Sequence, residues 1–132
     1  MSERWKHSNK TVYNIGYHLI WCPKYRRPVL IREVELRLRE LLYQKASEIQ
    51  VIIDTLSILP DHVHLFVKAS PTDSPHWVVQ QLKGFSSRIL RKEFPSLKSR
   101  LPCLWSRSYY CESVGHISEQ TIQKYIEDQK NQ

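Results

Sequence analysis

The sequence predicts a single α+β domain in which helices cover one mainly antiparallel sheet. Two observations lead to this fold class. Segments in which apolar residues alternate, as in strands, are interspersed with segments in which they recur every three to four residues, as in helices. The 132 residues contain no repeat, low-complexity tract or evident linker, so we expect one domain spanning residues 1–132.

The first predicted strand covers residues 13–21, where large apolar residues alternate with smaller or polar ones. It ends before Pro23, and a basic loop follows over residues 24–28. Residues 33–48 are predicted to be helical because apolar side chains recur there at helical spacing. These side chains are Val34, Leu38, Leu41, Leu42 and Ala46.

A hairpin and a second helix are predicted next. Residues 51–59 are rich in β-branched side chains and stop at Pro60, and residues 62–67 alternate again after a two-residue turn. A second helix is expected over about residues 78–92, followed by a looser stretch over 95–103.

The last predicted elements are an aromatic strand over about residues 104–111 and a terminal helix over about residues 121–128. Gly115 interrupts the chain between them, and Ser118 is a candidate N-cap for the helix. Strand, helix, strand, strand, helix, strand is the ferredoxin-like (RRM-like) βαββαβ arrangement, here with an extra C-terminal helix. Because that fold hosts many functions, it predicts none by itself.

Basic residues are concentrated in two parts of the chain. The stretches 4–32 and 83–107 hold fourteen of the twenty Lys and Arg residues but one of the thirteen Asp and Glu residues. Aromatic residues are interspersed among them. Cations neutralise phosphates and aromatic faces stack on unpaired bases, so the mixture favours single-stranded nucleic acid as a partner. A solvated basic surface over an aromatic core is the alternative interpretation.

Several classes of function are not expected. Only three glycines are present, and neither a Walker-type phosphate loop nor a dinucleotide fingerprint occurs. No apolar run approaches the roughly 20 residues that span a bilayer, and the first residues lack a signal-peptide pattern. We therefore expect a cytoplasmic protein without a membrane partner, with Cys22, Cys103 and Cys111 as reduced thiols.

Two histidines, His62 and His64, share one face of the third predicted strand, because residues two apart in a strand point to the same side. Their backbones then lie roughly 6.5–7 Å apart, so both imidazoles can reach one divalent ion. On spacing alone, two exposed or hydrogen-bonded histidines fit as well. For the preceding Asp61 a turn role is favoured over a further ligand or an outer partner of a histidine. For His18 a hydrogen-bonded sheet histidine is favoured over a place near this site.

In the terminal helix, Tyr125 and Gln129 are four residues apart and therefore lie one turn apart on one face. A tyrosine phenoxide can attack a phosphodiester, and the phosphotyrosine bond keeps the energy of the broken link for rejoining. Because the ordinary tyrosine pKa is about 10, the reaction needs a metal that polarises the phosphate, and a glutamine oxygen can complete its site. Taken alone, Tyr125 also fits a helix residue packed at the sheet edge. Tyr109 and Tyr110 are interpreted as core or stacking residues of the last strand.

Four segments occur together in one order along the chain. They are Tyr17-His18-Leu19-Ile20-Trp21-Cys22-Pro23-Lys24-Tyr25-Arg26, Asp61-His62-Val63-His64-Leu65-Phe66, Leu82-Lys83-Gly84 and Ile122-Gln123-Lys124-Tyr125-Ile126. With the His-hydrophobic-His motif among them, they resemble the single-tyrosine HUH transposases of insertion sequence 200/605 type. The resemblance extends from about Tyr17 to Gln129.

The resemblance implies a ferredoxin-like catalytic domain that acts as a homodimer on single-stranded DNA with hairpin ends. It implies that His62, His64 and Gln129 bind Mg²⁺ or Mn²⁺ and that Tyr125 is the catalytic nucleophile. Cleavage would leave a 5′-phosphotyrosine and a free 3′-OH that rejoins another end. The tyrosine helix commonly docks on the partner subunit's histidines in this family, so we expect an active site shared in trans.

Six basic residues are candidate DNA contacts, with a solvated surface as the alternative for each group. They are Lys24, Arg26 and Arg27 in the first loop and Lys83, Arg88 and Arg91 on the second helix. The chain departs from the family pattern in one segment, residues 105–109, where Ser106-Arg107 follows Trp105 in place of Asn or Gly and then Pro. This departure affects the expected turn and any DNA contact there, not the catalytic positions.

Two other functions remain open. A non-catalytic RRM-like module that binds single-stranded nucleic acid would explain the fold and the charge, but not the histidine pair or the Tyr125 and Gln129 spacing. A domesticated relative would use the same chemistry on dispersed genomic repeats, and only the DNA flanking its gene would distinguish it.

Overall fold

The computed structural model describes residues 6–8, 11–13, 15–113, 124 and 126–129. The strands are β1 (Lys6–Ser8), β2 (Thr11–Tyr13), β3 (Ile15–Trp21), β4 (Ile52–Leu59), β5 (His62–Ala69) and β6 (Tyr110–Ser113). The helices are the 3₁₀ turn η1 (Lys24–Arg26), α1 (Arg32–Glu48), α2 (Pro75–Glu93) and α3 (Pro95–Arg100). A terminal helix is seen at Lys124 and residues 126–128 and ends at Gln129.

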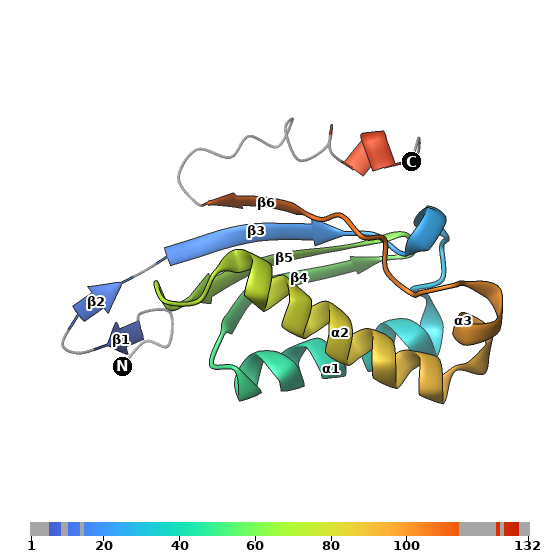
Figure 1. The fold of residues 1–132 in the computed structure, drawn as a ribbon, viewed down its shortest axis with the longest axis horizontal. Coiled ribbons are helices and arrows are strands. Elements are labelled where there is room, and N and C mark those ends of the chain that lie inside the picture. The colour runs from blue at the N-terminus through green and yellow to red at the C-terminus, as the bar shows by residue number, and fades with distance from the viewer. Residues whose placement is uncertain (1–5, 9–10, 14, 114–123, 125, 130–132) are drawn as a thin grey trace.

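One four-stranded sheet forms the centre of the fold. Its strand order is β4-β5-β3-β6, and every neighbouring pair is antiparallel. Helices α1 and α2 lie against one face, while the terminal helix lies on the opposite side (Figure 1). The predicted α+β class and ferredoxin-like strand arrangement are therefore confirmed.

The hydrophobic core lies between the sheet and the two long helices. Alternate residues of β3 and β5 enter it, and each helix presents one apolar stripe to them. Fully buried members include Leu19, Trp21, Val63, Leu65, Leu38, Leu41, Leu42 and Leu82. Burying one such aliphatic side chain contributes roughly 1.5–3 kcal/mol, so this layer fixes which face of each strand points away from the helices.

Helix α2 begins and ends at defined signals. The Ser74 hydroxyl accepts a hydrogen bond from the backbone N–H of Trp77 at 3.0 Å, and Pro75 occupies the first turn. The helix ends at Glu93, and Pro95 then starts α3. The looser stretch predicted over residues 95–103 is wrong over its first six residues, because a first-turn proline and the buried Leu97 support a short helix there.

The last strand is shorter than predicted. Residues 104–109 are not part of β6, which begins at Tyr110. Their backbone instead contacts the segment after β3. The N–H of Lys24 donates to the Leu104 carbonyl at 2.8 Å, and the N–H of Ser106 donates to the Cys22 carbonyl at 2.9 Å. These bonds define the geometry of the segment in which the sequence departs from the family pattern.

Two further differences concern the first strand and the terminal helix. β3 begins at Ile15 instead of residue 13, because Tyr13 belongs to a small hairpin of β1 and β2 that the sequence did not predict. Most of the helix predicted over residues 121–128, together with Gly115 and Ser118, lies outside the described residues. Among the helices that the structure describes, none is long and apolar enough to cross a bilayer.

Candidate functional site

The face of the sheet that α1 and α2 leave uncovered carries the two motif histidines. In β5, Val63, Leu65 and Val67 are fully buried in the core, so His62 and His64 point to the other side. We call this side the open face. The strand pairing confirms the geometry predicted from the i, i+2 spacing of the motif.

His62 is held by the residue that precedes it. Its Nδ1 atom lies 2.9 Å from Oδ1 of Asp61, and the residue as a whole is only 7% exposed. Because a carboxylate only accepts hydrogen bonds, Nδ1 is the protonated nitrogen, and in the neutral ring Nε2 keeps a free lone pair. Asp61 therefore lies in the turn between β4 and β5, as the sequence favoured, and is also a hydrogen-bond partner of His62.

The second oxygen of Asp61 belongs to an ion pair with the loop after β3. Oδ2 lies 2.8 Å from Nε of Arg26, at a bent angle. Burial alone would raise the pKa of Asp61, but the hydrogen bond from His62 and the charge of Arg26 outweigh it, so the pKa lies below its usual value. Asp61 thus remains a carboxylate at neutral pH.

The loop that carries Arg26 is strained. Tyr25 and Arg26 have φ angles of 59° and 52°, in the left-handed region, which costs roughly 1–2 kcal/mol for each non-glycine residue. Several contacts offset this cost. The Arg26 N–H donates to the Pro23 carbonyl at 2.8 Å, and the N–H of Leu30 donates to the Pro60 carbonyl at 3.0 Å. The second bond ties the loop to the turn that contains Asp61.

His64 contacts a third histidine. Nε2 of His64 lies 3.1 Å from Nδ1 of His18 on the neighbouring strand β3, and the His18 ring stacks on Phe66 with centroids 4.9 Å apart. Sequence reasoning favoured a satisfied sheet histidine for His18 over a place near the site. The structure shows that both descriptions hold, since the hydrogen bond of His18 is to the motif itself.

A tyrosine and a glutamate of β6 also lie on the open face. Ile20 of β3 pairs with Tyr110, and His18 pairs with Glu112. The Tyr110 hydroxyl donates to the Glu112 carboxylate. Desolvation and this hydrogen bond raise the pKa of Tyr110 to about 12, so its phenol stays protonated at neutral pH. The sequence places Tyr110 in the last predicted strand as a core or stacking residue; the strand is confirmed, but the pairing with Ile20 puts the side chain on the open face and not in the core.

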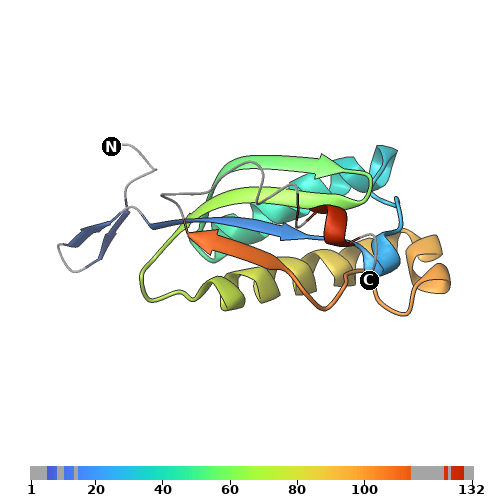
Figure 2. The same ribbon diagram turned by 90° about the horizontal axis from the view of Figure 1, so that it is seen from above.

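The terminal helix lies over the same end of the open face. Figures 1 and 2 both show it above the end of β3 that precedes η1. The register places His64 opposite Ile20 near this end, and Ile20 is fully buried although it points away from the core. Gln129 is also buried, at 6% exposure. Tyr125, the predicted nucleophile, lies outside the described residues.

Imidazole nitrogens and an amide oxygen are ligand types that divalent metal ions accept in proteins. Within the described ranges, no three His, Cys, Asp or Glu side chains converge as a metal cluster. A site here would therefore combine the imidazoles of His62 and His64 with an amide oxygen, as Gln129 can provide. Such a set leaves positions for phosphate oxygens and water.

The six predicted DNA contacts fall into different environments. Lys24 and Arg27 lie in the loop after β3, where Arg27 is exposed and the Lys24 ammonium lies 5.2 Å from the exposed Tyr25 ring. Arg26 is nearly buried against Asp61. Lys83 donates to the carbonyls of Ser106 and Ser108 at 2.6 and 3.4 Å, and burial lowers its pKa. In this structure Arg26 and Lys83 therefore hold loops of the protein itself.

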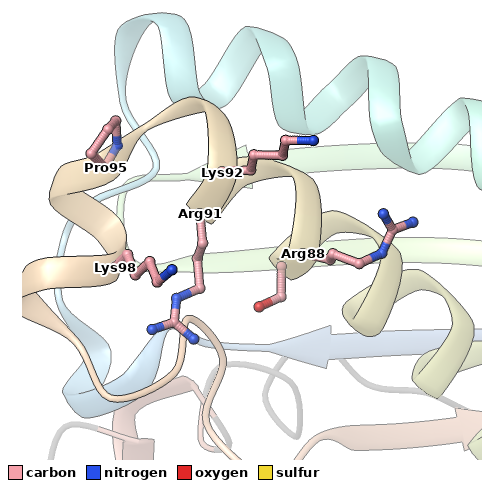
Figure 3. Close-up of a pocket in the computed structure, with 6 residues that line it drawn as sticks. Arg88, Arg91, Lys92, Pro95 and Lys98 are labelled. Carbon is pink, nitrogen blue, oxygen red and sulfur yellow. The ribbon is translucent and has the colours of Figure 1, made fainter.

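Arg88 and Arg91 line a groove in the helical layer. The groove has a volume of about 610 Å³, and among the described residues that line it four are cationic and none is acidic. The cations are Arg88, Arg91, Lys92 and Lys98 of α2 and α3 (Figure 3). Glu93, the one acid of this stretch, instead pairs with Arg37 of α1 at 2.8 Å. We call this feature the basic groove.

Comparison with known proteins gives consistent matches over most of the chain. Residues 11–129 match the family described as "Transposase IS200 like". The chain is 41% identical over 120 residues to the ISDra2 transposase TnpA of Deinococcus radiodurans. This match covers 89% of this chain and 86% of the relative. It is 31% identical over 121 residues to the transposase for insertion sequence element IS200 of Salmonella typhimurium, covering 90% and 79% of the two chains.

Solved structures show the same fold. A crystal structure described as a transposase from Deinococcus radiodurans superposes with a TM-score of 0.83 at 38% identity, covering 94% of this chain and 97% of that one. A REP-associated tyrosine transposase bound to a REP hairpin superposes with a TM-score of 0.59 at 12% identity, covering 96% and 68%. The extent of these matches, together with the paired histidines on the open face, shows that this chain belongs to the IS200-like transposase family.

Proposed function

We propose that this transposase cleaves and rejoins single-stranded DNA at the hairpin-flanked ends of a mobile element, in a metal-dependent reaction. The observation that carries the proposal is the pair of His62 and His64 on the open face, with the terminal helix above them. A protein of the same fold is a tyrosine transposase bound to a REP hairpin, which supports hairpin DNA as the partner.

Tyr125 is the proposed nucleophile. Its phenol oxygen attacks the phosphorus, the bond from phosphorus to the 3′ oxygen breaks, and the phenol proton passes through solvent to the leaving oxygen. The products are a 5′-phosphotyrosine and a free 3′-OH. In the second step the 3′-OH of another end attacks the same phosphorus, and Tyr125 leaves and regains a proton. Each step forms one phosphoester bond and breaks one, so no external energy source is required.

His62, His64 and Gln129 are the residues that would hold Mg²⁺ or Mn²⁺. The bound ion supplies positive charge that polarises the phosphate and stabilises the leaving oxygen. The chain's own contribution is to place the ligands. The sheet fixes both histidines on one face, Asp61 leaves Nε2 of His62 free, and the terminal helix carries Gln129 one turn from Tyr125.

DNA contacts are proposed at two places. The first is the loop after β3, through Lys24 and the exposed Arg27. The second is the basic groove, where Arg88 and Arg91 were expected from the sequence and Lys92 and Lys98 join them. None of the described residues that line the groove is aromatic, so we expect its contacts to be with phosphates and not with stacked bases.

The active unit is proposed to be a homodimer in which the terminal helices are exchanged. Helices α1 and α2 lie on the opposite side of the sheet and leave the open face uncovered (Figure 1). The terminal helix of either copy can therefore occupy the position over this face. Each active site would then combine His62 and His64 of one subunit with Tyr125 and Gln129 of the other.

The proposal is tested by metal binding and cleavage in His64→Ala. We expect the Mn²⁺ affinity to fall by more than the roughly 10–100-fold that loss of an outer hydrogen-bond partner costs, because a direct ligand is lost. Cleavage of hairpin-bearing single-stranded DNA should be lost while DNA binding persists. His76→Ala, on the exposed surface of α2, is the matched control and should change neither. An unchanged Mn²⁺ titration in His64→Ala would contradict the ligand assignment.

The same experiment separates the other candidate functions. A wild-type protein that binds hairpin DNA and Mn²⁺ without cleaving would favour the RRM-like binding module. A domesticated relative would cleave like a mobile transposase, so the DNA flanking the gene distinguishes it, through the presence or absence of element ends.

A further inference from the structure

Three side chains are linked in sequence by an ion pair and a hydrogen bond, and the last of them is a motif histidine. Arg26 contacts Oδ2 of Asp61 at 2.8 Å, and Oδ1 of Asp61 contacts Nδ1 of His62 at 2.9 Å. Asp61 thus uses one oxygen for the loop after β3 and the other for the ring. The side chains of Arg26 and His62 are 11% and 9% exposed and that of Asp61 is 29% exposed, so the two outer members are largely buried and the carboxylate between them is partly exposed.

The geometry restricts His62 in two ways. An imidazole that donates from Nδ1 to a fixed carboxylate cannot turn about its ring axis without losing that bond. The same bond keeps the proton on Nδ1 and leaves the Nε2 lone pair as the available ligand atom. A free imidazole exchanges between both tautomers and several rotamers, so only part of its population would present Nε2 to an ion.

Arg26 restricts Asp61 in turn. Asp61 lies in the two-residue turn between β4 and β5 and is 29% exposed, and its bond to His62 occupies Oδ1 and leaves Oδ2 to a second partner. The guanidinium comes from a loop that is distant in sequence and held in a left-handed conformation at Tyr25 and Arg26. The backbone bond from Leu30 to Pro60 keeps loop and turn together independently of the ion pair.

We propose that Asp61 is a positioning residue for His62, which it holds in the Nδ1-protonated tautomer with Nε2 free for a metal ion, and that Arg26 positions Asp61. This inference rests on the proposed metal-dependent function. It assigns the loop after β3 a role in preparing the metal site before any ion or DNA is bound.

The test begins with the metal-free protein, labelled with ¹⁵N-histidine and compared with His62→Gln for assignment. The ring nitrogen shifts of His62 should show a protonated Nδ1 and an unprotonated Nε2 in the wild type. Asp61→Ala should shift His62 towards the other tautomer and lower the Mn²⁺ affinity roughly 10–100-fold. Asp61→Asn keeps an acceptor oxygen and should therefore retain part of the Nδ1-protonated tautomer and part of the Mn²⁺ affinity that Asp61→Ala loses. Arg26→Gln should show the same changes as Asp61→Ala in weaker form.

Asp73→Asn, which removes a carboxylate from the loop before α2, is the charge-matched control and should leave both readouts unchanged. If Asp61→Ala fails to fold, Asp61→Asn and Arg26→Gln carry the test. The inference would be overturned if the His62 ring stays in the Nδ1-protonated form in Asp61→Ala and the Mn²⁺ affinity does not change. If Asp61→Ala does not fold, the same result in Arg26→Gln would overturn it. Failure of the proposed function looks different, because Mn²⁺ affinity would then be insensitive to His64→Ala as well.

Discussion

His62 and His64 owe their place in the site to the residues between and after them. Val63, Leu65 and Val67 are buried by α1 and α2, and this burial turns both imidazoles to the open face. A period of two is the most reliable pattern in a half-buried strand, so this part of the site could be predicted from the sequence.

The partners of these histidines could not be predicted in the same way. The contact of His18 with His64 depends on β3 lying next to β5, which is a property of the strand order. The ion pair of Arg26 with Asp61 depends on two left-handed residues in a loop, for which the sequence offers no glycine as a signal. Such contacts arise from tertiary packing and leave no periodic trace in the sequence.

Tyr110 provides a prediction at this scale, since it is a second tyrosine on the open face. Its raised pKa, about 12, and its bond to Glu112 make it a hydrogen-bond donor and a poor nucleophile at neutral pH. Tyr110→Phe should therefore keep near-wild-type cleavage at pH 7–8. Loss of cleavage in a folded Tyr110→Phe protein would assign this hydroxyl a part in the reaction.

The same residue predicts a pH effect on stability. The folded state binds the Tyr110 proton more tightly than the unfolded chain does. This difference therefore adds to the free energy of unfolding below the unfolded pKa of about 10, and the added stability is lost as the pH rises to about 12. Between pH 9 and 12, the Tm of Tyr110→Phe should therefore fall by less than the Tm of the wild type. Parallel Tm curves for the two proteins would contradict the pKa shift.

At the scale of elements, long periodic segments were predicted well and short ones were not. The periodicities that predict residues 33–48 and 51–59 correspond to α1 and β4 almost residue by residue. By contrast, α3 has six residues, too few for a helical period to show. Residues 104–109 look like an aromatic strand, but their backbone groups bond instead to the ammonium of Lys83 and to the backbone of Cys22 and Lys24 after β3.

The basic groove between α2 and α3 provides the prediction for elements. Replacing Arg88 and Arg91 by Ala together should weaken DNA binding and make it less dependent on salt. Each phosphate contact that is lost lowers the slope of log affinity against log salt by about 0.9 for duplex and about 0.7 for single strands. For two lost contacts, the magnitude of this slope should therefore fall by about 1.4–1.8 in the double variant.

Arg32→Ala combined with Arg39→Ala removes the same charge from α1, away from the groove lining, and is the matched control. Its slope should change much less. Equal slopes for the two double variants would show that the groove acts only through net charge. Tm values should accompany the binding data, because Arg91 also donates to the Leu101 carbonyl at 3.2 Å.

At the scale of the whole molecule, the fold separates stability from chemistry. One face of the sheet is covered by α1 and α2 and forms the core, and the terminal helix lies on the opposite side (Figure 1). That opposite face carries His62 and His64, because Val63, Leu65 and Val67 between and after them are buried in the core. The strand order could be predicted from the order of elements, because few antiparallel sheets accommodate two split βαβ halves. Which copy supplies each terminal helix cannot be read from one chain's sequence.

Exchange of the terminal helices predicts complementation between inactive subunits. Tyr125→Phe and His64→Ala proteins should each fail to cleave alone, but mixed dimers should recover cleavage. One of their two sites would combine intact histidines from one subunit with the intact tyrosine from the other. Absence of recovery in verified mixed dimers would show that each site is assembled within one chain.

The central claim is that Tyr125 forms a covalent bond to DNA. The most direct measurement is a denaturing gel with mass spectrometry on protein incubated with Mn²⁺ and hairpin-bearing single-stranded DNA from the gene's own flanks. We predict a DNA adduct on the peptide that contains Tyr125, absent from Tyr125→Phe and retained in Tyr110→Phe. An adduct on another residue, or cleavage by Tyr125→Phe, would contradict the account.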